Sequence, residues 1–336
     1  MNLVVLAEDV DSVALKNVAK VSEASAIEQI TTRSFRLVGA KPVEGLVAAC
    51  AAGGLDHVWL PEGRQLRDFG LFVTDMDSTL INIECIDEIA DMQGFKREVA
   101  AITEAAMQGE IDFRESLTRR VALLAGLPES ALAEVFDHRL QLNPGAERLL
   151  QGLQRAGIRT MLVSGGFTYF TERLKSRLGL DYAWANQLEV YDGKLTGKVL
   201  GDIVDGEAKA AHLEQVRDEL GLRPEQVIAA GDGANDIPML RAAGFGVAFH
   251  AKPVLRDVAH CCLDHTGLDG ILDLFGPGGE SCSRTRPPFS WERRKSRFRP
   301  PHLHRRVSAT PQPDRDSRRS HGALHRLGHP RPAPAL

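Results

Sequence analysis

Two aspartates separated by one residue follow directly on a short apolar run. Residues 71–74 have the composition of a buried strand, and Asp75 and Asp77 come immediately after it. At the end of a strand, carboxylates at this spacing can converge on one space of the size of a phosphate group. They also suit a hard cation such as Mg²⁺, which prefers oxygen ligands. The D-x-D pattern is common by chance, so this interpretation depends on further clusters.

A second cluster, Ser164-Gly165-Gly166, ends the apolar run at 158–163 and precedes a helical pattern at 167–178. Small residues at this position let backbone amides and a helix N-terminus approach an anion, and the Ser164 hydroxyl can donate another hydrogen bond. An ordinary glycine-rich turn explains this cluster alone equally well.

Two more clusters lie near a predicted helix start and at a predicted strand end. Lys209 lies near a helix start, where the dipole disfavours a positive charge; taken alone, it would be an ordinary surface lysine. Asp232, Asn235 and Asp236 follow the apolar run at 227–230, and a capping turn could explain one of them but hardly all three. Because strand ends and helix starts share one edge of a parallel sheet, we expect all four clusters to form one site.

The elements that must position these clusters alternate between strand and helix over residues 69–275. This alternation predicts an α/β fold with a Rossmann-like parallel sheet. Buried strands are expected at 71–74, 158–163, 227–230 and 246–249. Asp192-Gly193 predicts the turn of an additional hairpin.

An insertion at residues 84–142 has apolar residues at helical spacing and no convincing strand, which predicts a helical cap that could exclude water from a site. Residues 1–68 combine short apolar runs with a helical segment, which indicates a small N-terminal α+β module. The predicted parts are therefore the module at 1–68, the core at 69–83 and 143–275, the cap at 84–142 and a tail at 276–336.

The composition excludes several classes of protein. The 336 residues are 43% hydrophobic and lack a run long enough for a membrane span or a secretory signal, so we expect a cytoplasmic enzyme. The five cysteines, an odd number without C-x-x-C spacing, favour reduced thiols over disulfides or zinc ligands.

Charge is distributed unevenly along the chain. Residues 277–336 hold 14 Lys and Arg against 4 Asp and Glu, whereas residues 1–276 hold 27 against 41. The acidic body is a poor partner for nucleic acid, so no nucleic-acid binding is expected of it. Ten of the 17 prolines fall in the basic tail, which we expect to be disordered and without a role in the chemistry.

The four clusters together resemble the motifs of the haloacid dehalogenase superfamily, in order: Asp75-Met76-Asp77-Ser78-Thr79, Ser164, Lys209, and the acidic loop at 231–236. Within the superfamily the chain is similar to the phosphoserine phosphatase family, through residues 83–89, 163–167 and 231–236 over a region of roughly 69–275. The N-terminal module resembles the short regulatory modules that precede some members, with amino-acid-binding ACT domains as the suggested relative.

The resemblance implies Mg²⁺-dependent hydrolysis of O-phospho-L-serine, the last step of serine biosynthesis, through an aspartyl phosphate. It implies that Asp75 is the nucleophile, that Asp77 is the general acid and then base, and that Asp75, Asp77 and Asp232 hold Mg²⁺ with support from Asp236. It also implies a set of residues that bind the substrate: Glu84 at its ammonium, Arg120 at its carboxylate, Ser164, Gly165 and Lys209 at its phosphoryl group, Asn235 in orienting phosphate or Lys209, and Met107 and Phe113 in closing the pocket.

Two other functions stay open at the level of the sequence. The phosphoryl group could pass from Asp75 to an alcohol such as homoserine instead of to water. A protein of another class, a serine-binding regulator with a vestigial catalytic body, is opposed by the intact carboxylate and lysine set. The partner we expect is a small molecule, with no membrane partner; the oligomeric state stays open, with a homodimer as one option.

Overall fold

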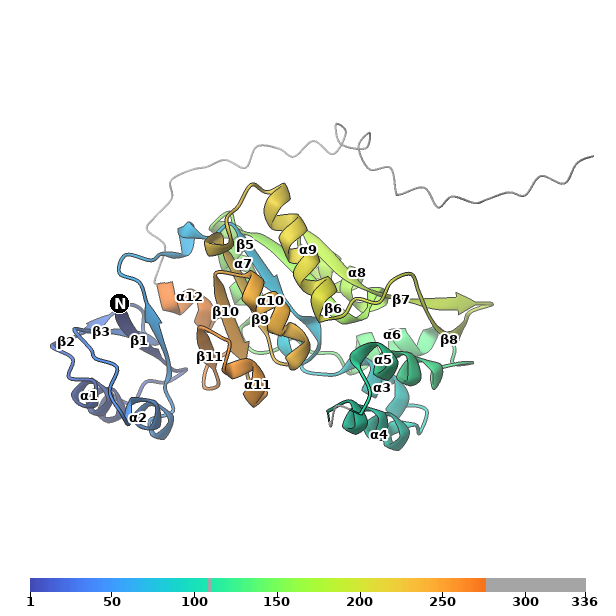
Figure 1. Ribbon diagram of the computed structural model, residues 1–336, viewed down its shortest axis with the longest axis horizontal. Helices are drawn as coiled ribbons and strands as arrows, with labels where there is room; N and C mark the ends of the chain where they lie inside the picture. Colours follow the sequence, from blue (N-terminus) through green and yellow to red (C-terminus); the bar gives the residue numbers. More distant parts are fainter. Residues whose placement is uncertain (108–109, 276–336) are drawn as a thin grey trace, which may run out of the picture. The chain divides into compact units, whose positions relative to one another are not determined.

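The computed structural model describes residues 1–107 and 110–275 (Figure 1). Within these residues eleven strands form one continuous sheet in the order β2-β3-β1-β4-β11-β10-β9-β5-β6-β7-β8. The strands are β1 (Asn2–Leu6), β2 (Ala26–Gln29), β3 (Ser34–Val38), β4 (Asp56–Leu60), β5 (Leu71–Thr74), β6 (Arg159–Phe167), β7 (Tyr182–Tyr191), β8 (Lys194–Leu200), β9 (Val227–Gly231), β10 (Phe245–Phe249) and β11 (Cys261–Leu263). The tail predicted at 276–336 lies outside the described residues.

The parallel part of the sheet confirms the predicted α/β class. Strand β5 pairs in parallel with β6 and β9, and β10 continues the parallel order from β9 to β11. Every residue of β5, β9 and β10 is buried, because helices cover both faces. Burial on both faces explains why these strands are continuous apolar runs in the sequence.

The helices on the two faces of the sheet bury alternate residues of the central strand, β5. Leu71 and Val73 belong to a core shared with α9 and α10, whereas Phe72 belongs to the core shared with α7 and α8. This alternation follows from the two-residue period of a strand. The helices of the parallel part are α7 (Ala146–Arg155), α8 (Thr168–Leu178), α9 (Gly206–Glu219), α10 (Ile237–Ala242), α11 (Pro253–Arg256) and α12 (Gly270–Phe275).

Strand β6 is longer than the sequence predicts. The apolar run ends at Val163, but the strand continues to Phe167, and its register with β7 is irregular between these two residues. The small residues in between allow the backbone to stay extended without a side chain to pack on each face. As a result, α8 begins at Thr168, and Ser164 stands inside the strand instead of in a turn.

The N-terminal residues add antiparallel strands to the same sheet. Strand β1 pairs with β3 and β4, and β4 reaches the parallel part through the pairing of His57 with Cys262 on β11. Helices α1 (Ser12–Val21) and α2 (Leu46–Ala52) pack a separate apolar core against these strands. The sequence did not predict α1 or β2.

An ion-pair network ties the N-terminal strands to α12. Arg33, in the loop before β3, contacts Glu8 at 2.7 Å and Asp269 at 2.8 Å, and it also pairs with Asp273. Arg148 of α7 adds a contact of 2.6 Å to Asp269. Both aspartates are buried, so their charges depend on these arginines for compensation.

The insertion predicted at 84–142, between β5 and β6, contains four helices. They are α3 (Cys85–Asp91), α4 (Lys96–Met107), α5 (Phe113–Ala122) and α6 (Ser130–His138). The hairpin of β7 and β8, which turns at Asp192-Gly193 as predicted, packs on them: the backbones of Leu127 and Leu195 are hydrogen bonded at 2.8 Å. Figure 1 shows this group beyond the end of the parallel strands.

The described cysteines, Cys50, Cys85, Cys261 and Cys262, are free thiols. Among the described residues, no helix combines the length and the apolar character needed to cross a bilayer.

Candidate active site

Asp75 stands at the end of the central strand and contacts a buried lysine. The Asp75 N–H donates to the carbonyl of Ala230 on β9 at 3.0 Å, which continues the sheet by one more bond. Its Oδ1 accepts the N–H of Met76 at 2.7 Å and lies 2.7 Å from Lys209 Nζ. Lys209 is fully buried in the first turn of α9, a helix whose start is capped by Asp205. The helix dipole disfavours the positive charge of Lys209 at this position, and the carboxylate of Asp75 compensates for it.

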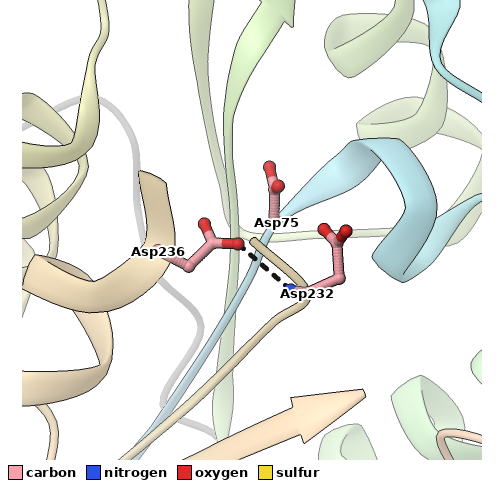
Figure 2. A group of neighbouring side chains, drawn as sticks. All are labelled: Asp75, Asp232 and Asp236. Atoms are coloured by element: carbon pink, nitrogen blue, oxygen red, sulfur yellow. Dashed lines mark hydrogen bonds between the residues drawn. The ribbon is translucent and has the colours of Figure 1, made fainter. Parts of the chain in front are cut away.

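The loop after β9 contributes two more carboxylates to the same space. Asp236 Oδ1 accepts from Lys209 Nζ at 2.8 Å, and its Oδ2 accepts from the backbone N–H groups of Asp232 and Gly233 at 3.1 and 3.2 Å. Carboxylate oxygens of Asp75, Asp232 and Asp236 all lie within 4.8 Å of one another (Figure 2). The structure thus brings together residues that are more than 150 positions apart in the sequence.

Burial sets the electrostatics of this group. Burial raises the pKa of Asp75, and Asp236 raises it further, although Lys209 acts in the opposite direction. Burial and Asp236 raise the pKa of Asp232 to about 6. Burial alone would lower the pKa of Lys209, but Asp236 and Asp75 outweigh it and raise that pKa. Three carboxylates facing one lysine leave an excess of negative charge that favours binding of a cation.

The donor set fits a divalent metal ion. Both oxygens of Asp236 are used by Lys209 and by backbone N–H groups, so this residue acts as a support. Among the described residues, Asp75 Oδ2 has no hydrogen-bond partner, and the carboxylate of Asp232 accepts only a long hydrogen bond of 3.3 Å from the Thr79 hydroxyl. Free carboxylate oxygens on Asp75 and Asp232 are ligands of the kind that hard divalent cations prefer.

Asp77 lies in a tight turn formed by Met76–Leu80, in which Ser78 has a positive φ of 55°. Its Oδ1 accepts the N–H of Cys85, the first residue of α3, at 3.2 Å. Burial and the neighbouring Glu84 raise the pKa of Asp77 to about 7. Asp77 can therefore both carry and release a proton near neutral pH.

Asn143, which was not among the residues predicted from the sequence, holds this turn in place. Its Nδ2 donates to the carbonyls of Ser78, Thr79 and Ile81 at 3.3, 2.8 and 3.0 Å. Within the described turn, these carbonyls accept no hydrogen bond from the backbone of a strand or helix. The side chain of Asn143, just before α7, supplies the donor instead. No local pattern around Asn143 marks this role in the sequence.

The backbone of Ser164-Gly165-Gly166 passes directly beside Asp77. A Cβ atom on Gly166 would lie 2.8 Å from Asp77 Oδ2, so the approach requires a glycine. Ser164 Oγ accepts the N–H of Gly166 at 2.8 Å and remains buried at the site. The Asn186 side chain, also missed from the sequence, anchors this segment by donating to the Gly165 carbonyl at 2.8 Å.

The helical insertion places its predicted residues over this edge of the sheet. Glu84 Oε1 accepts from the Ser78 hydroxyl at 2.8 Å. The Phe113 ring lies against Gly165, where an added Cβ would come within 2.8 Å of Phe113 Cζ. Arg120 is partly buried, and its charge interacts with those of Asp87, Glu84 and Asp77. The cap and the core therefore meet at the predicted site.

The structure says less about two of the predicted site residues, Met107 and Asn235. Met107 is the last residue of α4, and its side chain lies outside the described part of the structure. Asn235 lies in the turn Ala234–Asp236, with its Oδ1 beside Gly233, while Lys209 is paired with Asp75 and Asp236.

The fold and the site define a class of enzymes. Residues 72–241 match the family model of haloacid dehalogenase-like hydrolases, and the chain belongs to this family. It is 53% identical over 218 residues to a phosphoserine phosphatase of Albidiferax ferrireducens, a match that covers 63% of this chain and 92% of the relative. Residues 3–44 match a second family model, which is described as a domain of unknown function.

Two solved structures share the architecture. A probable phosphoserine phosphatase from Vibrio cholerae in an unliganded form has a TM-score of 0.72 at 36% identity, over 82% of this chain and 86% of that one. A phospho-aspartyl intermediate analogue of phosphoserine phosphatase has a TM-score of 0.58 at 42% identity, over 62% of this chain and 99% of that one. The second relative is covered almost completely by part of this chain.

Proposed function

We propose that this protein hydrolyses O-phospho-L-serine to L-serine and inorganic phosphate, through an aspartyl phosphate on Asp75 and with Mg²⁺ as its cofactor. The observation that carries the proposal is the position of Asp75: it ends the central strand, lies 2.7 Å from the buried Lys209, and has Asp232 beside it. The reaction would complete the biosynthesis of serine.

In the first half of the reaction, a carboxylate oxygen of Asp75 attacks phosphorus, and the bond from phosphorus to the serine oxygen breaks. The leaving oxygen needs a proton, which Asp77 supplies from its protonated form; its pKa of about 7 makes that form available at neutral pH. In the second half, Asp77 accepts a proton from water as the water oxygen bonds to phosphorus. Phosphate then leaves, and Asp75 is regenerated as a carboxylate.

Mg²⁺ would be held by Asp75, Asp232 and the backbone carbonyl of Asp77, with Asp236 as support. Bound there, the ion neutralises negative charge on the phosphoryl group and on Asp75, which would otherwise repel each other. Lys209 provides a second positive charge at Asp75, where Asp236 fixes its position.

Recognition of the substrate divides between the core and the cap. Ser164, Gly165 and Lys209 would bind the phosphoryl oxygens, with Asn235 orienting phosphate or Lys209. Glu84 would bind the substrate ammonium, and Arg120 would bind the carboxylate, to which a guanidinium can donate two parallel hydrogen bonds. Phe113, which packs on Gly165, and Met107 would close the pocket.

The test of this function is release of inorganic phosphate from O-phospho-L-serine by the full chain. We expect turnover with Mg²⁺, loss of turnover with EDTA, and recovery when Mg²⁺ is restored in excess. Asp75→Asn should lower kcat by roughly 10⁴-fold or more, because the nucleophile is removed. Rapid acid quench with ³²P-labelled substrate should trap alkali-labile label on the wild-type chain and none on Asp75→Asn.

The same assay separates hydrolysis from transfer to an alcohol. With L-homoserine added as acceptor, a hydrolase releases phosphate at an unchanged rate and forms no new phosphoester. Failure of the wild-type chain to release phosphate from O-phospho-L-serine with Mg²⁺ present would contradict the proposal.

A further inference from the structure

Asp87 carries a buried carboxylate oxygen that no other described residue contacts through a hydrogen bond. It lies in the first turn of α3, three residues after Glu84, which is the N-cap residue of this helix and whose carboxylate interacts with the charge of Asp87. Among the described residues, Asp87 Oδ1 is shielded from solvent and accepts no hydrogen bond. A buried acceptor without a hydrogen bond is unfavourable, so a nearby donor is expected to use it at some stage of the reaction.

The candidate donor is Arg120 on α5, which among the basic side chains near Asp87 acts on it most strongly, ahead of Lys96 and Lys252, although no hydrogen bond joins the two residues in the described structure. The one side-chain hydrogen bond of Arg120 within the described structure runs from Nε to the carbonyl of Ser116 in its own helix, and at 3.4 Å it is long. Burial lowers the pKa of Arg120, and its acidic neighbours act against burial in the order Asp87, Glu84 and Asp77. Asp87 is thus the carboxylate whose charge acts most strongly on this partly buried guanidinium.

Glu84 is less suited to hold Arg120. Its Oε1 already accepts the hydroxyl of Ser78 at 2.8 Å, and its remaining oxygen is the one assigned to the substrate ammonium. A guanidinium has five N–H donors in a rigid fork, so one edge can be held by a protein carboxylate while another faces a ligand. Asp87 has the free acceptor that such an arrangement requires.

We propose that Asp87 is a positioning residue whose Oδ1 accepts a hydrogen bond from Arg120 and so aims the guanidinium at the carboxylate of the substrate. Asp87 therefore contributes to the choice of amino-acid phosphates over other phosphate esters. This inference rests on the proposed function, because it assigns the substrate carboxylate to Arg120.

The experiment compares three substrates on matched variants of the full chain. O-Phospho-L-serine has an ammonium and a carboxylate, O-phosphoethanolamine has only the ammonium, and p-nitrophenyl phosphate has neither. Asp87→Asn removes the charge at constant shape. Asp91→Asn is the control, since it makes the same change on the same helix at a residue that pairs with Arg139 away from the site.

We expect Asp87→Asn to lower kcat/KM for O-phospho-L-serine by roughly ten- to a hundredfold, mainly through KM, because a charged hydrogen bond contributes about 1.5–3 kcal/mol. The two substrates without a carboxylate should change by less than about threefold. In an Arg120→Ala background, Asp87→Asn should cause no further loss, and Asp87→Glu should recover part of the wild-type KM. Asp91→Asn should match the wild type.

Equal losses on all three substrates would overturn the inference, because they would show a general structural role. A larger loss on O-phosphoethanolamine than on p-nitrophenyl phosphate would also overturn it, since Asp87 would then bind the ammonium. Independent losses from Asp87→Asn and Arg120→Ala would overturn it as well. Absence of O-phospho-L-serine turnover by the wild-type chain would instead contradict the proposed function, so the two failures are distinguishable.

Discussion

Lys209 Nζ lies between two carboxylates, 2.7 Å from Asp75 Oδ1 and 2.8 Å from Asp236 Oδ1, and all three side chains are buried. This arrangement pairs Asp75 Oδ1 with Lys209 and so fixes the orientation of the Asp75 carboxylate. Because Asp236 is also bonded to the backbone of the loop after β9, Lys209 links β5 to β9 through ionic contacts. The same lysine therefore serves stability and charge neutralisation.

Lys209→Met should destabilise the fold and remove activity together. Taking away one partner leaves the buried charges of Asp75 and Asp236 uncompensated, and we expect the free energy of unfolding to fall by about 3–5 kcal/mol. Urea denaturation followed by circular dichroism measures this change. Lys16→Met, on the exposed face of α1, is the control and should stay within about 0.5 kcal/mol of the wild type. A Lys209→Met chain as stable as the control would contradict the importance of the ion pairs.

Asp232→Asn should weaken binding of the metal. In the wild-type chain, Mg²⁺ should raise the melting temperature without substrate, because an ion that binds only the folded state stabilises it by about 2.7 kcal/mol at a hundred times its Kd. Asp232→Asn removes one ligand charge, so the same increase should require at least tenfold more Mg²⁺. Asp257→Asn, on an exposed turn, should respond like the wild type. An unchanged Mg²⁺ titration for Asp232→Asn would exclude this residue as a ligand.

Gly165→Ala should hinder closure of the cap. The new Cβ would lie 2.8 Å from Phe113 Cζ, so the ring must move away from the core. We expect kcat/KM for O-phospho-L-serine to fall by about tenfold or more, since small displacements of positioning groups have large effects on rate. Combining Gly165→Ala with Phe113→Leu should recover part of the loss by making room. A double variant slower than either single variant would argue against a direct clash.

His57 should make stability depend on pH. Burial lowers the pKa of His57 in the folded protein, with Asp56 acting in the opposite direction. The unfolded chain therefore binds a proton more readily, and the stability that neutral His57 contributes is lost as pH falls through its unfolded pKa of about 6.5. Between pH 8 and 5.5, the wild type should lose more unfolding free energy than His57→Gln, as measured by urea denaturation. His138→Gln, at an exposed position, should follow the wild type.

The sequence predicts the buried elements of this fold better than its exposed ones. Strands β5, β9 and β10 are continuous apolar runs because both of their faces are covered, so composition alone marks them. In contrast, every residue of β2 is exposed, and this strand forms only because β3 offers it a free edge. No local pattern encodes a pairing of this kind.

The residues of the candidate site that could be predicted from the sequence are those whose side chains have a recognisable chemical character of their own. Asp75, Lys209 and Asp232 are charged groups next to apolar strands or at helix starts, and the structure brings them together. Asn143 and Asn186 escaped notice because ordinary amides in the sequence give no sign of the carbonyl groups that they will reach. Their positions depend on contacts between segments that only the folded chain defines.

The arginine that reaches from the loop before β3 to α12 limits how far this chain can be shortened. A fragment that starts at residue 69 would keep every catalytic side chain, yet it would lose Arg33 and leave Asp269 and Asp273 to repel each other with only Arg148 nearby. It would also leave β11 without its neighbouring strand β4. A minimal catalytic fragment of this protein should therefore be less stable than the full chain, and neutral replacements at those two aspartates should recover part of the loss.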